Sequence, residues 1–178
     1  ALMAVMMLGA FSGCSNDGGS ADAGDSDTIR IGGLAPLTGD ASSYGVAVNN
    51  GIQMAIEDIN ADGGIGGKQI EYVYYDEKGD ATEAVNAYNT LKDWGLQVLA
   101  GPVTTTPSIA VAAETANDTL FMMTPSASAP AVIESGDNVF QICFTDPNQG
   151  VASADYIADN KLGTKAVSYT HLRAHETR

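Results

Sequence analysis

Hydroxyl-bearing side chains concentrate in three loops of this chain, at residues 35–45, 101–108 and 124–130. The second loop also opens an expected helix, and free N–H groups at a helix N-terminus bind a carboxylate or a phosphate. No loop of the three contains Lys or Arg, which argues against a multiply charged phosphate and favours a single carboxylate. Ser and Thr also serve as plain turn and cap residues, so this alternative stays open. The candidate hydrogen-bond donors are the hydroxyl groups of Thr104, Thr105, Ser126 and Ser128.

The rest of the sequence does not favour catalysis by these hydroxyl groups. A nucleophilic hydroxyl needs a general base, and both histidines, His171 and His175, lie at the very end of the chain. Carboxyl groups cluster at Asp76, Glu77 and Asp80, but no apolar residue beside them would raise a pKa. We therefore expect a solvated acidic turn there and not a paired-carboxylate hydrolase. The sequence predicts a binding protein that is not an enzyme and needs no cofactor.

The two histidines also raise the question of a metal site. Their spacing of four residues can bind a metal ion on a helix. No third ligand accompanies them, and residues 168–178 resemble a translated cloning sequence more than a protein segment. No metal site is therefore expected.

Alternating strand and helix signals position the hydroxyl-rich loops. Runs rich in branched and aromatic residues predict strands at 28–34, 68–76, 96–101, 119–124 and 138–145. Strands that alternate with helices of ten or more residues indicate an α/β fold, with a mostly parallel sheet flanked by helices. In such sheets the ligand lies beyond the carboxyl ends of the strands, where these three loops are expected.

Apolar spacing and cap residues predict the helices. A stripe at three- and four-residue spacing predicts an amphipathic helix over 44–60, and it consists of Val48, Ile52, Ala55 and Ile59. Asp80 with Glu83 is typical of a helix cap, and the stripe of the helix that follows consists of Val85, Tyr88 and Leu91. Thr106 and Pro107 are interpreted as an N-cap and a first helical residue, and Asp146 with Pro147 starts another helix.

Length and charge limit the possible partners. At 178 residues the chain can form one domain, or one lobe of a larger one. Its formal net charge of −14 repels phosphate backbones, so no nucleic acid partner is expected. The same charge provides no basic patch for anionic lipids.

One of the two cysteines lies where N-terminal hydrophobicity ends. Residues 1–13 are apolar and too short to span a bilayer, but they have the length of a signal-peptide core. Ser12 and Gly13 precede Cys14, and this arrangement resembles the lipobox of bacterial lipoproteins, with Phe11 at the usual Leu position. Residues 15–27 are small and polar, as in a flexible tether. We expect a partial signal peptide at 1–13, and at 14–27 a lipidated cysteine with its tether to the bacterial membrane.

Five linked segments resemble one family. They are "IGGLAPLTGDASSYG", "GIQMAIEDINADGGIGGKQIEYVYYDEKGDATEAV", "LAGPVTTTPSIAVA", "MTPSASAP" and "VFQICFTDPNQG". In this order and spacing, from about Thr28 to Ala166, the chain resembles the type I periplasmic binding proteins of ABC importers, in particular the branched-chain amino acid group. The resemblance implies the first lobe of a two-lobed protein, with a ligand held between the lobes.

The resemblance also implies roles for particular residues. Tyr44 matches an aromatic residue that packs on the ligand, and Thr105 matches a hydroxyl and N–H near the ligand carboxylate. The remaining matched positions are the wall residues Val103 and Thr104 and the head-group loop of Ser126, Ala127 and Ser128. Some relatives join two loops by a disulfide where this chain has Gly79 and Thr104, so a looser Gly79 loop is expected. Cys143, in a β-rich run, is expected to be buried within a strand.

The implied function is capture of a small amino acid outside the cytoplasmic membrane and its delivery to an ABC permease and ATPase complex. Branched-chain amino acids are favoured as ligands. A ligand-sensing receptor of the same fold, for amides, urea or other small carboxylates, stays open as the alternative. We expect the N-terminal lobe at 28–146, the start of the second lobe at 147–167, and a foreign tail at 168–178.

Overall fold

Five parallel strands form the single sheet of the part of the chain that the structure describes. The computed structural model describes residues 28–165, and the sheet has the order β2-β1-β3-β4-β5. The strands are β1 (Thr28–Ala35), β2 (Gln69–Asp76), β3 (Val98–Ala100), β4 (Phe121–Thr124) and β5 (Val139–Gln141). The helices are α1 (Ser42–Ala61), α2 (Ala81–Trp94), α3 (Thr105–Asp118), the short 3-10 helix η1 (Pro130–Val132) and α4 (Asp146–Asp159). The predicted parallel sheet flanked by helices is confirmed.

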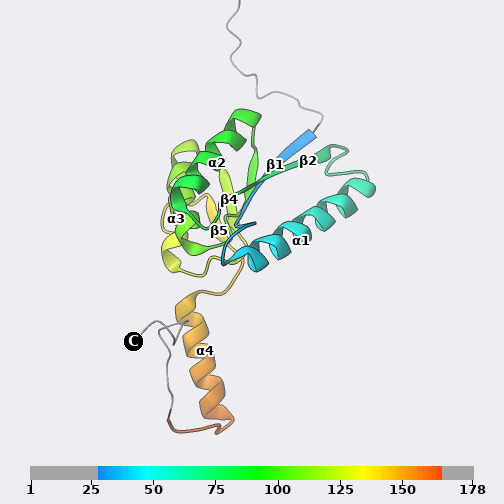
Figure 1. The fold of residues 1–178 in the computed structure, drawn as a ribbon. Coiled ribbons are helices and arrows are strands. Elements are labelled where there is room, and N and C mark those ends of the chain that lie inside the picture. The colour runs from blue at the N-terminus through cyan, green and yellow to red at the C-terminus, as the bar shows by residue number, and fades with distance from the viewer. Residues whose placement is uncertain (1–27, 166–178) are drawn as a thin grey trace, which may run out of the picture.

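The main hydrophobic core lies between the sheet and helices α2 and α3. These two helices pack together on one face, whereas α1 lies on the other face against β1 and β2 (Figure 1). Strand side chains alternate between the faces. Leu34, Leu99 and Met122, from three neighbouring strands, are fully buried against Tyr88 of α2 and Val111 of α3. This core fixes the edge of the sheet where the strands end.

Helix α2 begins and packs as its residues predict. The Asp80 side chain caps it by accepting hydrogen bonds from the N–H groups of Thr82 and Glu83, at 2.8 and 3.0 Å. Its buried face carries Ala84, Tyr88 and Leu91, with Val85 partly buried beside them. The predicted cap and stripe of this helix are therefore confirmed.

The predicted buried stripe of α1 is wrong in its orientation. The residues of α1 that are buried are Gly45, Asn49 and Ile56. Of the predicted stripe, Val48 and Ile52 are half-buried, and Ala55 and Ile59 are exposed. The reason is polar: the Tyr72 hydroxyl of β2 donates a 2.9 Å hydrogen bond to Asn49 Oδ1. This contact turns Asn49 toward the sheet, and a stripe derived from apolar residues alone misses it.

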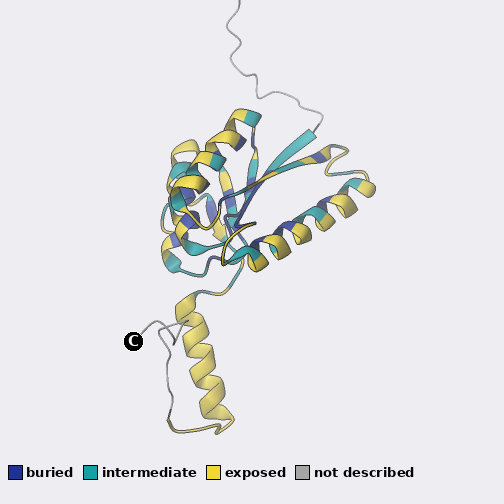
Figure 2. Cartoon of the chain, in the orientation of Figure 1, coloured by how far each residue is buried: buried dark blue, intermediate teal, exposed yellow. Residues whose placement is uncertain are grey.

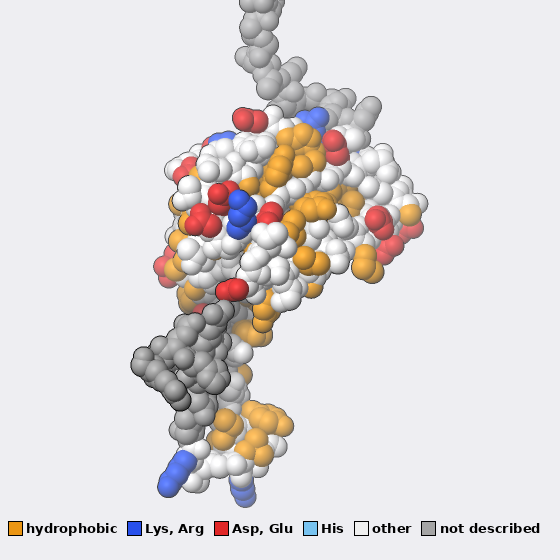
Figure 3. Space-filling view, in the orientation of Figure 1, with side chains coloured by type: hydrophobic (Ala, Val, Ile, Leu, Met, Phe, Trp, Pro, Cys, Tyr) orange, Lys and Arg blue, Asp and Glu red, His pale blue; other side chains and the backbone are white. Residues whose placement is uncertain are grey.

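Helix α4 stands apart from the lobe. All of its residues are exposed, and it projects away from the sheet beyond β5 (Figure 2). Hydrophobic side chains lie along this projecting part as well as on the lobe (Figure 3). Between residues 28 and 165, no helix combines the length and apolar character needed to cross a membrane.

The connection from β5 to α4 corrects the prediction for Cys143. The strand ends at Gln141, and Cys143 is only half-buried beyond it. Here the chain leaves the sheet toward α4, so the β-rich run at 138–145 is only partly strand.

Several predictions concern residues outside those described. They are the signal peptide at 1–13, the lipidated Cys14, the tether that follows it, and the tail with His171 and His175.

Candidate functional site

A cavity of about 250 Å³ opens at the carboxyl edge of the sheet. It is formed where the loops after β3 and β4 meet the first turn of α1. Its lining residues are Ala41, Tyr44, Val103, Thr104, Thr105 and Ser126. Five of the seven ligand-site residues predicted from the sequence therefore line one cavity, although they lie more than 80 positions apart at the extremes.

Close packing at the start of α1 places Tyr44. A Cβ atom on Gly45 would lie 2.0 Å from the Pro36 carbonyl oxygen, so only glycine allows this approach of α1 to the loop after β1. Tyr44 lies directly before Gly45 in the chain. It is 64% exposed and lines the cavity. An exposed aromatic side chain at this position is available to pack on a ligand.

A shared acceptor ties the loops after β3 and β4 together. The Pro102 carbonyl oxygen accepts hydrogen bonds from Thr124 Oγ1 at 2.7 Å and from Ser108 Oγ at 3.0 Å. Thr124 Oγ1 in turn accepts from the Ala127 N–H at 3.2 Å. Ser108, Thr124 and Ala127 are buried, so these bonds fix the loops after β3 and β4 relative to each other.

The N-terminus of α3 supplies the polar wall. The helix begins at Thr105 with Thr104 as N-cap, two residues before the start predicted at Thr106 and Pro107. Thr104 makes no side-chain cap bond, and its Oγ1 is buried without a partner among the described residues. First-turn N–H groups without a helical partner, beside the Thr105 hydroxyl, suit a carboxylate.

The predicted head-group loop is only partly at the cavity. Ser126 lines it, but the structure does not place Ala127 or Ser128 among its lining residues. Ala127 is fully buried, and its carbonyl oxygen accepts hydrogen bonds from Cys143 Sγ at 3.3 Å and from the Gln141 side chain. The Ser128 carbonyl oxygen accepts from the Asp146 N–H at 3.0 Å, at the start of α4. Ala127 and Ser128 thus connect the lobe to the segment that leads into α4.

A second cavity of about 600 Å³ adjoins the first and shares three lining residues with it, Ala41, Thr104 and Thr105. The loop after β2 forms its other side, which sequence reasoning did not assign to the site. This loop contributes Lys78 and Gly79, and Gly79 and Thr104 line the same cavity, as expected from their matched positions. A position directly after a strand that ends at this edge was the available signal.

The predicted solvated acidic turn is wrong for Glu77, which is buried, and for the half-buried Asp76, whereas Asp80 is exposed at the start of α2. Asp76 accepts hydrogen bonds from the Thr38 hydroxyl at 2.6 Å and from the N–H groups of Leu37 and Lys78. Partial burial acts to raise the pKa of Asp76, but these hydrogen bonds outweigh it and hold the pKa below its usual value. The Asp76 contacts join the loop after β2 to the loop after β1, so the expected looseness of the Gly79 loop finds no support.

Glu77 departs furthest from the prediction. Its side chain is 0% exposed, and Oε2 accepts a 2.6 Å hydrogen bond from the Gly79 N–H. Desolvation by burial raises the pKa of Glu77 to about 7, because the Gly79 bond offsets only part of it and Asp76 and Asp80 add repulsion. The acidic cluster had no apolar neighbour in sequence, but the fold supplies the burial.

Within 28–165, no group of three or more His, Cys, Asp or Glu side chains is placed to hold a metal ion. The 250 Å³ cavity is lined by hydroxyl groups, an aromatic ring and small apolar side chains, and the adjoining 600 Å³ cavity adds the charged side chains of Asp40 and Lys78. These groups can hold a small ligand that carries a carboxylate.

Comparison with known proteins gives this geometry a family context. Residues 28–175 match the periplasmic binding protein family. The chain is similar to the Leu/Ile/Val-binding protein BraC3 of Rhizobium johnstonii, with 37% identity over 133 residues. That match covers 74% of this chain and 36% of BraC3, so the chain spans less than two fifths of the relative's length.

Two solved structures share the fold. One is the branched-chain amino acid transporter substrate binding protein LivJ from Streptococcus pneumoniae, in complex with isoleucine, at a TM-score of 0.70 and 32% identity. The other is the leucine binding protein LivK from Thermotoga maritima, at a TM-score of 0.67 and 30% identity. The matches cover 74% and 75% of this chain and 38% of each of those chains.

Proposed function

This chain belongs to the periplasmic binding protein family, and we propose that it forms the first lobe of a solute-binding protein for branched-chain amino acids. The protein would capture its ligand outside the cytoplasmic membrane and deliver it to an ABC transporter. The observation that carries this proposal is the cavity at the N-terminus of α3, where Tyr44, Thr105 and Ser126 come together. The similarity to Leu/Ile/Val-binding relatives supports the choice of ligand.

Different residues of the cavity lining suit the head group and the side chain of an amino acid. The first-turn N–H groups of α3 and the Thr105 hydroxyl suit the carboxylate, and no described lysine or arginine lines the 250 Å³ cavity. The Ser126 position is available to the ammonium group through its carbonyl oxygen. Tyr44 and Val103 provide apolar surface toward the side chain. This half-site binds an amino-acid head group and leaves side-chain selection to the opposite lobe.

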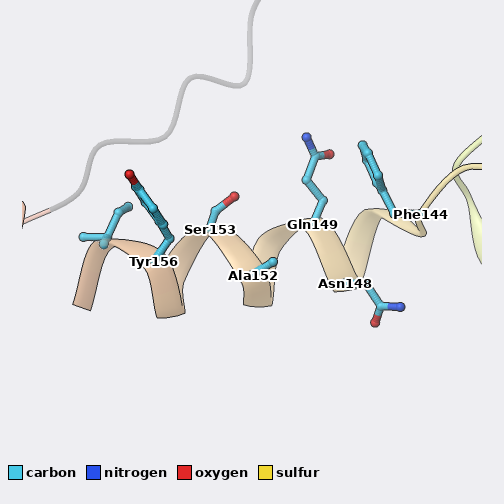
Figure 4. A pocket seen from close by; sticks show the side chains of 7 residues that line it. Phe144, Asn148, Gln149, Ala152, Ser153 and Tyr156 are labelled. Atoms are coloured by element: carbon cyan, nitrogen blue, oxygen red, sulfur yellow. The ribbon is translucent and has the colours of Figure 1, made fainter. Parts of the chain in front are cut away.

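Helix α4 is proposed as the start of that opposite lobe. A groove of about 560 Å³ runs along it, and Phe144, Gln149, Ser153 and Tyr156 project from the same side (Figure 4). No other described element packs on this groove. The chain matches 36% of the length of BraC3, and the rest of that relative is long enough to form a second lobe around the counterpart of α4.

Membrane attachment through a lipidated Cys14 is proposed as well. The support is the lipobox resemblance at residues 11–14. Labelling of the full-length protein with a fatty acid in a bacterial host should mark the wild type and leave Cys14→Ser unlabelled. Equal labelling of the two proteins would contradict the anchor.

Calorimetry on the full-length protein tests the binding function. Leucine or isoleucine should bind, and Thr105→Val should weaken binding about ten- to a hundredfold, because a hydrogen bond to a charged group is lost. Thr82→Val is the matched control: Thr82 is an exposed threonine in the first turn of α2, and it lines neither cavity. Its affinity should change less than threefold. Equal losses in both variants, or no binding of any branched-chain amino acid, would contradict the proposal.

A further inference from the structure

Glu77 is the one carboxyl side chain among the fully buried residues of the described chain. Its Oε2 accepts a 2.6 Å hydrogen bond from the Gly79 N–H, whereas Oε1 is buried without a hydrogen-bond partner among residues 28–165. A buried carboxylate with an unpaired oxygen is costly, so the neutral acid is the form that suits this position. The group is buried beneath a loop and not exposed to ligand, so it would act through its neighbours.

The charges around Glu77 do not compensate a negative charge. Asp76 and Asp80 flank it and repel its ionised form. The Lys78 ammonium instead pairs with Glu83, with Nζ 3.5 Å from Oε2. The first turn of α3, residues 105–108, carries no charged side chain, and the loop after β1 contributes a further acid, Asp40, to the shared cavity.

The Gly79 amide that Glu77 holds belongs to the turn that borders the site. Gly79 lines the 600 Å³ cavity together with Thr104, Thr105 and Thr106 at the start of α3. The Gly79 turn and the N-terminus of α3 therefore line one cavity together, and that cavity shares Thr104 and Thr105 with the 250 Å³ cavity.

We propose that Glu77 is a positioning residue for the ligand site: it holds the Gly79 turn beside α3, and it takes up one proton from solvent when a carboxylate binds there. The proposal rests on the proposed function, because the carboxylate is that of the amino acid ligand. The new O–H bond forms on the Glu77 carboxyl group, and the proton comes from the buffer. The ligand's negative charge disfavours the Glu77 carboxylate, so ligand binding and protonation favour each other.

The linkage has a defined sign. Burial places the pKa of Glu77 at about 7 before ligand binds. A ligand carboxylate raises that pKa further, so proton uptake is largest at and just above neutral pH. Affinity should then fall as pH rises through this range, by at most tenfold per pH unit for one proton.

Calorimetry of leucine binding to the full-length protein in buffers of different ionisation enthalpy measures this proton directly. Wild type should take up a fraction of a proton at pH 7.5 and lose affinity about three- to tenfold between pH 6 and 8.5. Glu77→Gln keeps an acceptor for the Gly79 N–H but cannot ionise, so it should bind without proton uptake and with little pH dependence. Glu57→Gln, which removes an exposed acid of α1 that lines neither cavity, is the matched control and should behave as wild type.

Proton uptake that persists in Glu77→Gln, or a wild type that binds without proton uptake, would overturn the proposal and leave the proposed function intact. A wild type that binds no branched-chain amino acid at any pH would overturn both. If Glu77→Gln does not fold, the Gly79 amide resonance of wild type decides. It should titrate with a midpoint near 7, and ligand should move the midpoint upward; an unmoved midpoint would overturn the proposal.

Discussion

The lobe and helix α4 contain similar residues, but the lobe buries them and α4 leaves them exposed. Tyr88 of α2 is 0% exposed and donates a 2.7 Å hydrogen bond to Asp118, whereas Tyr156 of α4 is 63% exposed. Both helices have 14 residues and capped N-termini. The difference shows that amphipathic sequence forms a helix locally, but burial requires a partner surface. The lobe has that surface within residues 28–145, whereas no element within residues 28–165 provides one for α4.

Matched tyrosine truncations should give the largest contrast. Tyr88→Ala removes a fully buried ring and its hydrogen bond, and should lower the free energy of unfolding of this chain by about 3–5 kcal/mol. Tyr156→Ala should change it by less than about 0.5 kcal/mol, because the ring is already in water. Urea denaturation of both variants measures the difference. Equal destabilisation would mean that α4 packs on the lobe in solution.

Glu77 gives a second difference between the lobe and α4, because it is buried whereas every acidic residue of α4 is exposed. The pKa of Glu77 is about 7 in the folded chain against an ordinary value of 4.5. The folded state therefore binds the Glu77 proton more tightly than the unfolded state. The stabilisation from this group is complete below about pH 4.5, declines as pH rises to about 7, and stays lost above it.

Glu77→Gln should remove this decline. At pH 8 it should stabilise the chain by about 1–3 kcal/mol, because a buried charge is replaced by a neutral group. Asp155→Asn in α4 is the control and should leave the pH profile unchanged. Thermal melts from pH 4.5 to 8.5 measure both effects, and a Glu77→Gln profile that parallels wild type would contradict the burial of an ionised Glu77.

Cap removal should give the smallest contrast. Asp80 accepts two short N–H bonds at the start of α2, so Asp80→Ala should cost about 1 kcal/mol of unfolding free energy. Thr145 caps α4 with a single 3.4 Å bond, and Thr145→Ala should reduce helicity without moving the main unfolding transition. Circular dichroism combined with denaturation separates these results. A shift of the main transition by Thr145→Ala would show that α4 unfolds with the lobe.

The sequence predicts correctly the structural features that depend on residues close together along the chain. The Asp80 cap, the Asp146 helix start and the parallel sheet all follow from local spacing, and the fold confirms them. The same reasoning brings Tyr44, Thr105 and Ser126 to one edge, because loops that follow parallel strands must meet there.

The errors arise where burial depends on elements distant in sequence. Glu77 follows a strand with many exposed residues, and only the packed fold removes it from water. Asn49 is turned inward by Tyr72, which lies 23 positions later. Ser128 belongs to the predicted head-group loop, yet it is not among the residues that line the cavity. Its carbonyl oxygen instead accepts a hydrogen bond from the Asp146 N–H at the start of α4. None of these contacts has a local signature.

The shared acceptor at Pro102 has a consequence for the entropy of recognition. Thr124 and Ser108 both donate to that carbonyl oxygen, so the loops after β3 and β4 are ordered before any ligand arrives. The conformational entropy that a flexible site loses on binding has already been lost in folding. The amino acid ligand of the proposed function would therefore need no further ordering of these two loops when it binds.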